Sequence, residues 1–499
     1  MGQSPRIAGS SAHIIESHHT KQGSLHQNRC YALLRGNAHN TAQNEGKRVS
    51  KHDVTNSWCG KNHAGILAGS RSLHKYSFSK PNITRIGFPY AKRLRSKGTA
   101  VLSLIARSAG RVPLREATEI EGHAVRAMYL MAGATDLYLE TGEQALLDAL
   151  MRLWRDMTAR KMFITGGLGS RYEGESFGDP YELPSDRCYC ETCAAIGSIM
   201  WNWRMLLATG QAQFADLIEQ TIYNGFLSGL ALDGAHFFYV NPLLSRGNYA
   251  RMEWYGVPCC PPNIMRTIAT VEQYMATADA HGLQVHLFHP AEIRATLGSG
   301  PAVSLRMETA YPWEGNIRLI VGETNGASWS LSLRIPGWAE GAKLRVNGEV
   351  LDLVARPGHY AAIERAWRTG DTVELILPMA PYLVEPHPWI DAIRNSLAIR
   401  RGPLLYCLEQ ADQNANVMAV QLDDQTPLEE EWDAQLLGGM VVIRASGFEV
   451  DTSSWDECLY RPRGHFTTPV LRPVQLRAIP YFAWGNRGAN AMRVWIPRR

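Results

Sequence analysis

The spacing of hydrophobic residues changes near residue 283, and this change constrains the fold more than any other feature. Before it, apolar residues recur with helical spacing, most clearly at about 143–159 and 192–208. After it, apolar and polar residues alternate, as at 331–335 and 373–377. A chain with helical periods first and strand periods afterwards is expected to form separate α and β domains rather than a βαβ sheet.

The expected helices carry their own boundary signals. Gly210 ends the helix at about 192–208, because glycine readily adopts the left-handed backbone conformation. A third helix is expected from Phe214 to Ile222. Asn263 is a suitable N-cap for an apolar run that reaches Met275. Short connections between these segments are typical of an antiparallel α/α array, and we expect a helical domain over 111–282.

The alternating part of the chain predicts two β-rich domains. Its strands are short and numerous, and Asn347-Gly348 is a strong signal for a hairpin turn. We expect an antiparallel β-sandwich over 283–385. A second β-rich domain is expected over 386–499, ending in the strand-like residues 493–496.

The first 110 residues differ from the rest in charge. They hold 17 Lys and Arg against three acidic residues, a net charge of +14, whereas the remainder carries −10. A basic arm for nucleic acid and a transit peptide are two alternatives. The stretch lacks the lysine-dense helices and interleaved aromatic residues of nucleic-acid binders. We therefore expect no nucleic-acid partner, and predict that residues 1–110 form an atypical, poorly ordered extension.

The composition indicates the compartment in which the protein is expected and which kinds of partner it is expected to lack. Hydrophobic residues make up 45% and charged residues 20% of the chain, as in soluble globular proteins. No run of 18 apolar residues occurs, which argues against a membrane span, and the N-terminus lacks the apolar stretch of a secretory signal. Five of the nine cysteines fall between residues 188 and 260. This clustering favours a metal or thiol site in a reducing, cytoplasmic environment over a disulfide framework.

The clustered cysteines form the strongest local signal for chemistry. Cys188, Cys190 and Cys193 lie at the start of a predicted helix, and Cys259-Cys260 lie before another. Zinc takes four ligands from thiolate, imidazole and carboxylate groups. From spacing alone, Cys190 and Cys193 would join Cys259 and Cys260 in a structural Cys₄ site. The alternative is that these cysteines are small buried hydrophobic residues.

Two further segments need interpretation. The glycine-rich stretch 165–170 matches neither a dinucleotide fingerprint nor a phosphate loop, and we interpret it as a tight turn. A loop rich in Gly and Pro follows it and carries several acidic residues. Most such carboxylates are solvated surface groups, but one beside a metal-bound thiolate would suit a general acid. The candidates are Glu173, Glu175, Asp179, Glu182 and Asp186.

Six short strings, in order along the chain, resemble glycoside hydrolase family 127. The resemblance runs from about Val112 to the C-terminus. The strings are EGHAVRAMY at 121–129, TGG at 165–167, GESF at 174–177, ETC at 191–193, FYVNP at 238–242 and CCPPN at 259–263.

The resemblance implies an (α/α)₆ barrel followed by β-sandwiches, and retaining hydrolysis of β-L-arabinofuranosides in an oligosaccharide or glycoconjugate. It implies Zn²⁺ as cofactor, with Glu191 replacing the Cys190 of the spacing-only interpretation. It also implies a cysteine nucleophile, a glutamate acid/base and two sugar contacts. The residues at the matching positions are Glu191, Cys193, Cys259 and Cys260 for zinc, Cys259 as nucleophile, Glu175 as acid/base, and His123 and Tyr239 for the sugar.

The chain departs from the family in one respect, and two other functions are considered as alternatives. Only about six helices are expected between 112 and 285, so we predict a partial barrel, with no visible counterpart of its N-terminal half in residues 1–110. A non-catalytic remnant stapled by zinc is one alternative. A sugar epimerase would need paired histidines, and only His123 and His236 precede residue 280 in the helical part. The oligomeric state is left open, with a homodimer among the alternatives.

Overall fold

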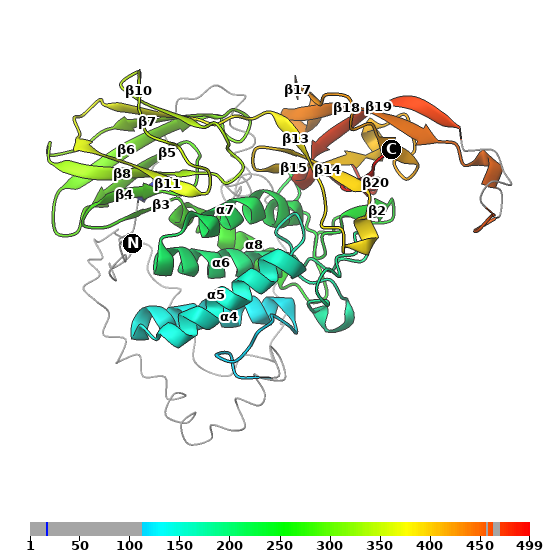
Figure 1. The fold of residues 1–499 in the computed structure, drawn as a ribbon, viewed down its shortest axis with the longest axis horizontal. Coiled ribbons are helices and arrows are strands. Elements are labelled where there is room, and N and C mark those ends of the chain that lie inside the picture. Colours follow the sequence, from blue (N-terminus) through cyan, green and yellow to red (C-terminus); the bar gives the residue numbers. More distant parts are fainter. Residues whose placement is uncertain (1–15, 18–111, 456–457, 463–469) are drawn as a thin grey trace, which may run out of the picture. The chain divides into compact units, whose positions relative to one another are not determined.

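The computed structural model describes residues 16–17, 112–455, 458–462 and 470–499. In this part of the chain helices come first and strands afterwards, which confirms the predicted order of α and β structure (Figure 1). The prediction for residues 1–110 falls outside the described residues, apart from the two-residue strand β1 (Glu16–Ser17).

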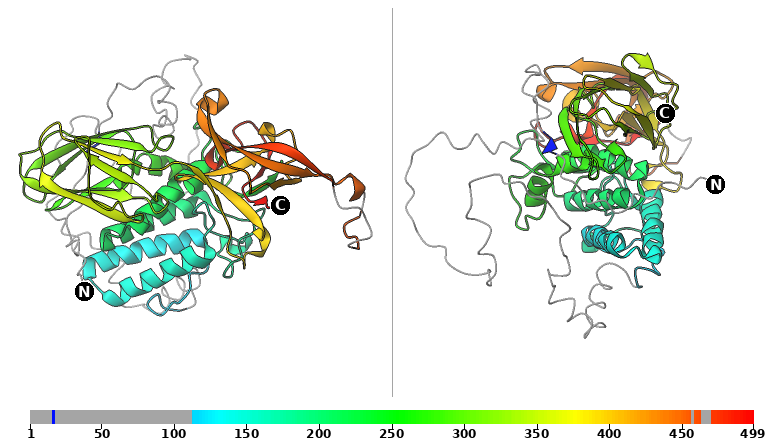
Figure 2. Two further views of the ribbon diagram at one scale, coloured as in Figure 1. Left: turned by 45° about the horizontal axis from the view of Figure 1, so that its top comes forward. Right: turned by 90° about the vertical axis from the view of Figure 1, so that its left-hand side faces the viewer.

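The helical part contains five α-helices among the described residues. Figure 1 shows them in layers, with α7 nearest the sheets and α4 and α5 furthest from them, and Figure 2 shows the same order from two other directions. The predicted partial (α/α)₆ barrel stays a prediction. The helices are α4 (Ala124–Thr141), α5 (Gln144–Asp156), α6 (Thr192–Thr209), α7 (Ala212–Thr221) and α8 (Cys260–Ile268).

Helices α5 and α6 confirm the periodicity of the sequence. Gly210 ends α6 as predicted, with a φ of 68° and its N–H bonded to the carbonyl of Leu206. Helices α4 and α6 approach closely at Gly197, where a Cβ atom would lie 2.7 Å from the Cβ of Met128. Glycine at this position therefore lets the two backbones pack tightly.

Helix α8 corrects one prediction. It begins at Cys260, with Cys259 as its N-cap residue, and Asn263 lies inside it. The reason is the Pro261-Pro262 pair, since proline fits the first helical turn, where backbone N–H groups have no helical partner. The helix also ends at Ile268, and a short 3₁₀ helix (Val271–Tyr274) carries the rest of the apolar run.

The first strand-rich region is a sandwich of two sheets. The larger sheet has the order β1-β5-β6-β7-β12-β9-β10, and the smaller has the order β11-β8-β4-β3. Pairing is antiparallel except between β4 and β8, which are parallel. Its strands are β3 (Ala276–Ala278), β4 (Gly282–Val285), β5 (Ala291–Thr296), β6 (Ala302–Thr309), β7 (Asn316–Val321), β8 (Ser328–Ile335), β9 (Lys343–Val346), β10 (Glu349–Val350), β11 (His359–Ala366) and β12 (Thr372–Ile376).

The sandwich core follows from the alternation seen in the sequence. Along β7 and β8 every second side chain is buried, and these side chains form one apolar cluster between the sheets. Asn347 and Gly348 join β9 to β10 with φ values of 52° and 84°. Two positive φ values define the hairpin turn that Asn-Gly favours, so the predicted turn is confirmed.

The second strand-rich region is built on a sheet with the order β13-β14-β15-β19-β18-β16, to which β17, β20, β21 and β2 are added. Strand β2 comes from the helical part of the chain and pairs with β20. The strands are β2 (Leu244–Arg246), β13 (Pro381–Val384), β14 (Ser396–Arg401), β15 (Leu404–Glu409), β16 (Val420–Leu422), β17 (Glu429–Asp433), β18 (Met440–Val450), β19 (Leu471–Pro480), β20 (Ala491–Arg493) and β21 (Ile496–Pro497).

This sheet shares a core with the helices. One buried cluster contains Ile196 of α6 and Phe238 together with Tyr406 and Trp484 of the C-terminal region. Asn224 adds a polar link, because its side chain bonds the carbonyl of Pro403 and the N–H of Leu405 at 2.9 and 2.8 Å. The segment that directly follows α7 is therefore tied to the C-terminal sheet.

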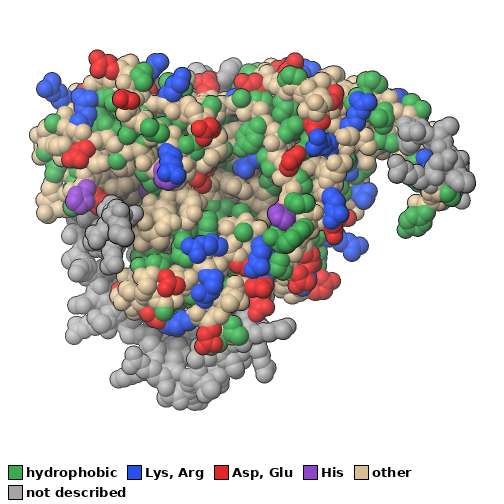
Figure 3. Space-filling view, viewed as in Figure 1, with side chains coloured by type: hydrophobic (Ala, Val, Ile, Leu, Met, Phe, Trp, Pro, Cys, Tyr) green, Lys and Arg blue, Asp and Glu red, His purple; other side chains and the backbone are tan. Residues whose placement is uncertain are grey.

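Surface charge and the apolar character of the helices are relevant to nucleic-acid and membrane binding. Figure 3 shows acidic and basic side chains interspersed over the face that it displays. Among the described residues, no helix combines the length and the apolar character needed to cross a bilayer.

Candidate active site

The N-terminal ends of two helices bring four potential metal ligands together. Glu191 is the N-cap residue of α6 and Cys193 is its second residue, whereas Cys259 caps α8 and Cys260 begins it. Backbone N–H groups at a helix N-terminus lack helical partners and favour nearby negative charge. Both helices therefore direct the positive ends of their dipoles at this group of carboxylate and thiol side chains.

The four side chains lie close enough together to share one metal ion. One ligand atom from each of Glu191, Cys193, Cys259 and Cys260 lies within 4.8 Å of all the others. The Sγ of Cys259 is 3.2 Å from Oε1 of Glu191, and the Sγ atoms of Cys193 and Cys260 are 3.5 Å apart. The 191–193 and 259–260 segments, 66 or more positions apart in the sequence, thus meet through the four residues that the resemblance named.

The electrostatics of this cluster suit a cation. Burial and the neighbouring Cys259 raise the pKa of Glu191 to about 8. Hydrogen bonds from Cys193 and Cys260 lower the pKa of Cys259, whereas the pKa values of Cys193 and Cys260 themselves are raised by those contacts. Four acidic groups cannot all ionise side by side unless a cation neutralises them.

The donor set fits zinc. Three thiols and one carboxyl are ligands that zinc takes in proteins, and four is its usual coordination number. Oε2 of Glu191 is buried and has no hydrogen-bond partner among the described residues. A buried carboxylate oxygen without a partner is costly, and a bound cation would satisfy it.

Cys190 does not join this group, so the Cys₄ interpretation is wrong. Its side chain is fully buried beside Cys188 and packs closely against Gly167. The φ of Cys190 is +37°, which turns the chain between Cys190 and Glu191. Glu191, rather than Cys190, faces the other cysteines.

The predicted acid/base residue lies beside a predicted sugar contact. Nε2 of His123 is 3.0 Å from Oε2 of Glu175. His123 caps α4, and a β-bridge joins it to Ser176, the neighbour of Glu175. Burial lowers the pKa of His123, against the opposing effect of the Glu175 carboxylate, so its imidazole is neutral at pH 7.

Tyr239 connects this pair with the cysteine cluster. Its phenol oxygen is 3.3 Å from the Sγ of Cys259. Burial and the contact with Cys259 raise the pKa of Tyr239, so the phenol keeps its proton and can donate to the sulfur. Tyr189 packs edge-on against Tyr239, with ring centroids 6.0 Å apart, and interacts with both Tyr239 and Glu175. All seven predicted site residues therefore belong to one connected set.

Sequence reasoning missed the roles of Tyr189 and Tyr255. Tyr189 lies inside the cysteine-rich string, which gave a signal for metal binding and none for an aromatic contact. Tyr255 acts through its hydroxyl, which accepts the backbone N–H of Tyr239 at 3.0 Å and donates to the carbonyl of Phe237 at 2.6 Å.

The glycine-rich stretch and the other acidic residues have structural roles. Gly166 and Gly169 have φ values of 79° and 98°, and the N–H of Gly166 bonds the carbonyl of Phe163, which confirms a tight turn. Asp179 and Glu182 both pair with Arg171. Of the five candidate carboxylates, Glu175 alone is paired with a predicted site residue in the described part.

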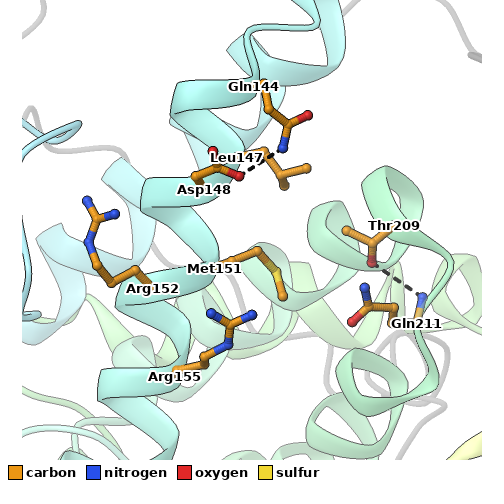
Figure 4. A pocket seen from close by; sticks show the side chains of 8 residues that line it. All are labelled: Gln144, Leu147, Asp148, Met151, Arg152, Arg155, Thr209 and Gln211. Carbon is orange, nitrogen blue, oxygen red and sulfur yellow. Dashed lines mark hydrogen bonds between the residues drawn. The ribbon is translucent and has the colours of Figure 1, made fainter.

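A cavity of about 420 Å³ lies elsewhere, between α5 and the turn from α6 to α7 (Figure 4). None of the predicted site residues lines it. Of the residues that line it, Gln144 bonds Asp148 at 2.9 Å, and Arg152 bonds the carbonyls of Ala117 and Arg115. The cluster, not this cavity, is the site that the sequence predicted.

Comparison with known families assigns all three regions of the chain. Residues 71–273 match the model of the β-L-arabinofuranosidase GH127 catalytic domain, residues 282–379 match the GH127 middle domain, and residues 381–497 match the family 127 C-terminal domain. The chain belongs to glycoside hydrolase family 127. The match begins at residue 71, earlier than the Val112 predicted from the motifs, so part of the basic N-terminal stretch is family sequence.

Individual members of family 127 agree with this assignment. A non-reducing end β-L-arabinofuranosidase of Bifidobacterium longum subsp. longum is 32% identical over 410 residues, which cover 77% of this chain. A family 127 β-L-arabinofuranosidase of Geobacillus stearothermophilus T6 has a TM-score of 0.74 and 39% identity, over 78% of this chain and 62% of its own. Another glycoside hydrolase structure has a TM-score of 0.74 and 37% identity, over 78% of this chain and 68% of its own.

The chain spans 61% of the length of the Bifidobacterium relative. Family membership therefore rests on the matched regions, which include every residue of the cysteine cluster and of the His123–Glu175 pair.

Proposed function

We propose that this chain is a retaining glycosidase that releases terminal β-L-arabinofuranosyl residues from oligosaccharides or glycoconjugates. Cys259 is the nucleophile and Glu175 the acid/base, while His123 and Tyr239 hold the sugar. The observation that carries the proposal is the contact set that links Glu175, through Tyr189 and Tyr239, to the sulfur of Cys259. This contact set supports the proposal, because a retaining glycosidase needs an acid and a nucleophile close to the same glycosidic bond.

The residues divide the reaction into two displacements. In the first, the Cys259 thiolate bonds to the anomeric carbon, the glycosidic C–O bond breaks, and Glu175 gives its proton to the departing oxygen. In the second, Glu175 takes a proton from water, the water oxygen bonds to the anomeric carbon, and the C–S bond breaks to regenerate the thiolate. Two inversions at one carbon give net retention.

The chain's own groups prepare the sulfur for attack. The N-terminus of α8 and the Tyr239 phenol both stabilise a thiolate at Cys259. Glu191, Cys193, Cys259 and Cys260 would hold zinc, which supplies deprotonation of the coordinating thiols. Neutral His123 orients the Glu175 carboxyl through its Nε2.

The proposal is tested on a nitrophenyl β-L-arabinofuranoside. We expect Cys259→Ser to lower kcat by at least about 10³-fold, because a hydroxyl is a poorer nucleophile at neutral pH. Glu175→Gln should lower kcat by about 10²-fold or more with an alkyl leaving group, and much less with nitrophenolate, which leaves without a proton. Full activity of Cys259→Ser would exclude the cysteine mechanism.

Metal analysis tests zinc binding independently of catalysis. We expect about one zinc per chain, lost in Cys193→Ala and retained in Cys190→Ala, a matched control because Cys190 is buried nearby but outside the cluster. A chain that binds zinc but hydrolyses no arabinofuranoside would be the non-catalytic remnant.

A further inference from the structure

Three aromatic side chains meet beside the loop that carries Glu175. The ring of Tyr181 stacks on His387 with centroids 4.5 Å apart, and Trp389 packs edge-on against both, at 5.1 Å from Tyr181 and 5.3 Å from His387. Trp389 is nevertheless 67% exposed. A tryptophan held in place but left in water buries little of its apolar surface within the chain, which is typical of a ligand contact.

The segment that presents Trp389 is stiff. Pro386 and Pro388 flank His387, and proline fixes the backbone φ. The N–H of Trp389 bonds Nδ1 of His387 at 3.2 Å, and the N–H of the buried Ile390 bonds the carbonyl of His387 at 3.0 Å. A ring on such a support loses little conformational entropy when it binds.

Arg171 connects this aromatic cluster with the acid/base residue. Its backbone exchanges hydrogen bonds with Ser176, next to Glu175, while its side chain pairs with Asp179 and Glu182, next to Tyr181. Tyr181 is six positions after Glu175 in the sequence, so their Cα atoms lie within about 20 Å of each other. Glu175 and Tyr181 are therefore parts of one braced loop.

The role of Glu175 decides which part of a substrate meets the cluster. An acid that protonates the glycosidic oxygen stands between the sugar being released and the leaving group. An aromatic surface on the loop that carries this acid can therefore meet a residue of the leaving group. We propose that Tyr181, His387 and Trp389 form a platform on which a sugar residue of the leaving group stacks. The proposal rests on the proposed function and names the part of the substrate that the chain recognises away from the cleaved bond.

Hydrolysis of two substrates tests the platform. Trp389→Ala should lower kcat/KM for a β-linked L-arabinofuranotetraose about tenfold, mainly through KM, because one stacking contact is lost. The nitrophenyl arabinofuranoside has no sugar on its leaving side and should react unchanged. Trp389→Phe should recover part of the loss. The control is Trp432→Ala on β17, since Trp432 is 50% exposed but lies outside the platform.

Binding separates this proposal from the catalytic one. Calorimetric titration of Cys259→Ser with the tetraose needs no turnover. Weaker binding when Trp389→Ala is added supports the platform even if the chain hydrolyses neither substrate. Equal binding with and without Trp389→Ala, or an equal loss of kcat/KM on both substrates, overturns it.

Discussion

Tyr239 is the residue on which the geometry around the sulfur depends, and it is itself held by a neighbour. Its phenol lies 3.3 Å from the Sγ of Cys259, and its ring is packed between Tyr189 and Tyr255. The Tyr255 hydroxyl accepts the N–H of Tyr239 and donates to the carbonyl of Phe237. One hydroxyl therefore satisfies two backbone groups and fixes the backbone from which the Tyr239 phenol reaches the sulfur.

Tyr255→Phe should separate this positioning role from simple packing. The ring stays, but the N–H of Tyr239 and the carbonyl of Phe237 lose their partner, at a cost of about 1–3 kcal/mol. We expect Tyr239 to shift when its N–H loses this partner, so kcat should fall about tenfold. The zinc content should stay unchanged, because Tyr255 is not a metal ligand.

The matched control is Tyr249→Phe. The Tyr249 hydroxyl bonds the carbonyl of Val240 at 2.8 Å and has no contact with the Tyr239 N–H. Tyr249→Phe should lower the free energy of unfolding by about 1 kcal/mol with little change in kcat. Equal losses of kcat in the two variants would show that the loop as a whole, and not Tyr255, positions Tyr239.

At the scale of elements, segments with one clear local signal were predicted correctly, and the start of α8, where two local signals compete, was not. The spans of α5 and α6 followed from their apolar stripes, and the β9–β10 turn followed from Asn347-Gly348, because each signal lies within its own segment. The start of α8 was misplaced because the N-cap preference of Asn263 was given more weight than the Pro261-Pro262 pair. Its signal was present in the sequence.

The site was predicted only in part, because its contacts join residues far apart in the sequence. The motifs supplied Glu191, Cys193, Cys259 and Cys260, but spacing alone chose Cys190, since the backbone turn that selects Glu191 depends on a bridge to Val240. The contacts of Tyr189 and Tyr255 likewise depend on the packing of both residues against Tyr239, which lies 50 and 16 positions away in the sequence. No local pattern encodes that packing.

Substitution of two helix glycines by alanine should change the free energy of unfolding in opposite directions. Gly133 lies inside α4, is exposed, and has open space where a Cβ would stand, so Gly133→Ala should raise the free energy of unfolding by about 0.5–1 kcal/mol. Gly210 caps α6 with a φ of +68°, so Gly210→Ala should lower it by about 1 kcal/mol. Urea denaturation of both variants measures the difference. Stabilisation by Gly210→Ala would contradict the left-handed cap.

At the scale of the whole molecule, one buried arginine joins the helices to the sandwich. Arg334 of β8 is fully buried and bonds Asp216 and Glu219 of α7 at 2.6 and 2.5 Å. Its Nε donates to the carbonyl of His286 at 2.6 Å, and Tyr311 donates to Glu219 at 2.7 Å. Helix α7 follows α6, whose first turn carries Glu191 and Cys193, so this junction supports the layer that holds the site.

Loss of this arginine should cost far more than loss of a surface arginine. Arg334→Met leaves Glu219, which is 3% exposed, as a buried carboxylate without its cation, and should lower the free energy of unfolding by about 3–5 kcal/mol. Arg444→Met is the control, because its partner Glu431 is exposed and such pairs contribute about 0–1 kcal/mol. The double variant Arg334→Met, Glu219→Leu should recover much of the loss, since apolar groups replace both buried charges. Urea denaturation measures all three, and an Arg334→Met loss no larger than that of Arg444→Met would show that the ionic junction does not stabilise the fold.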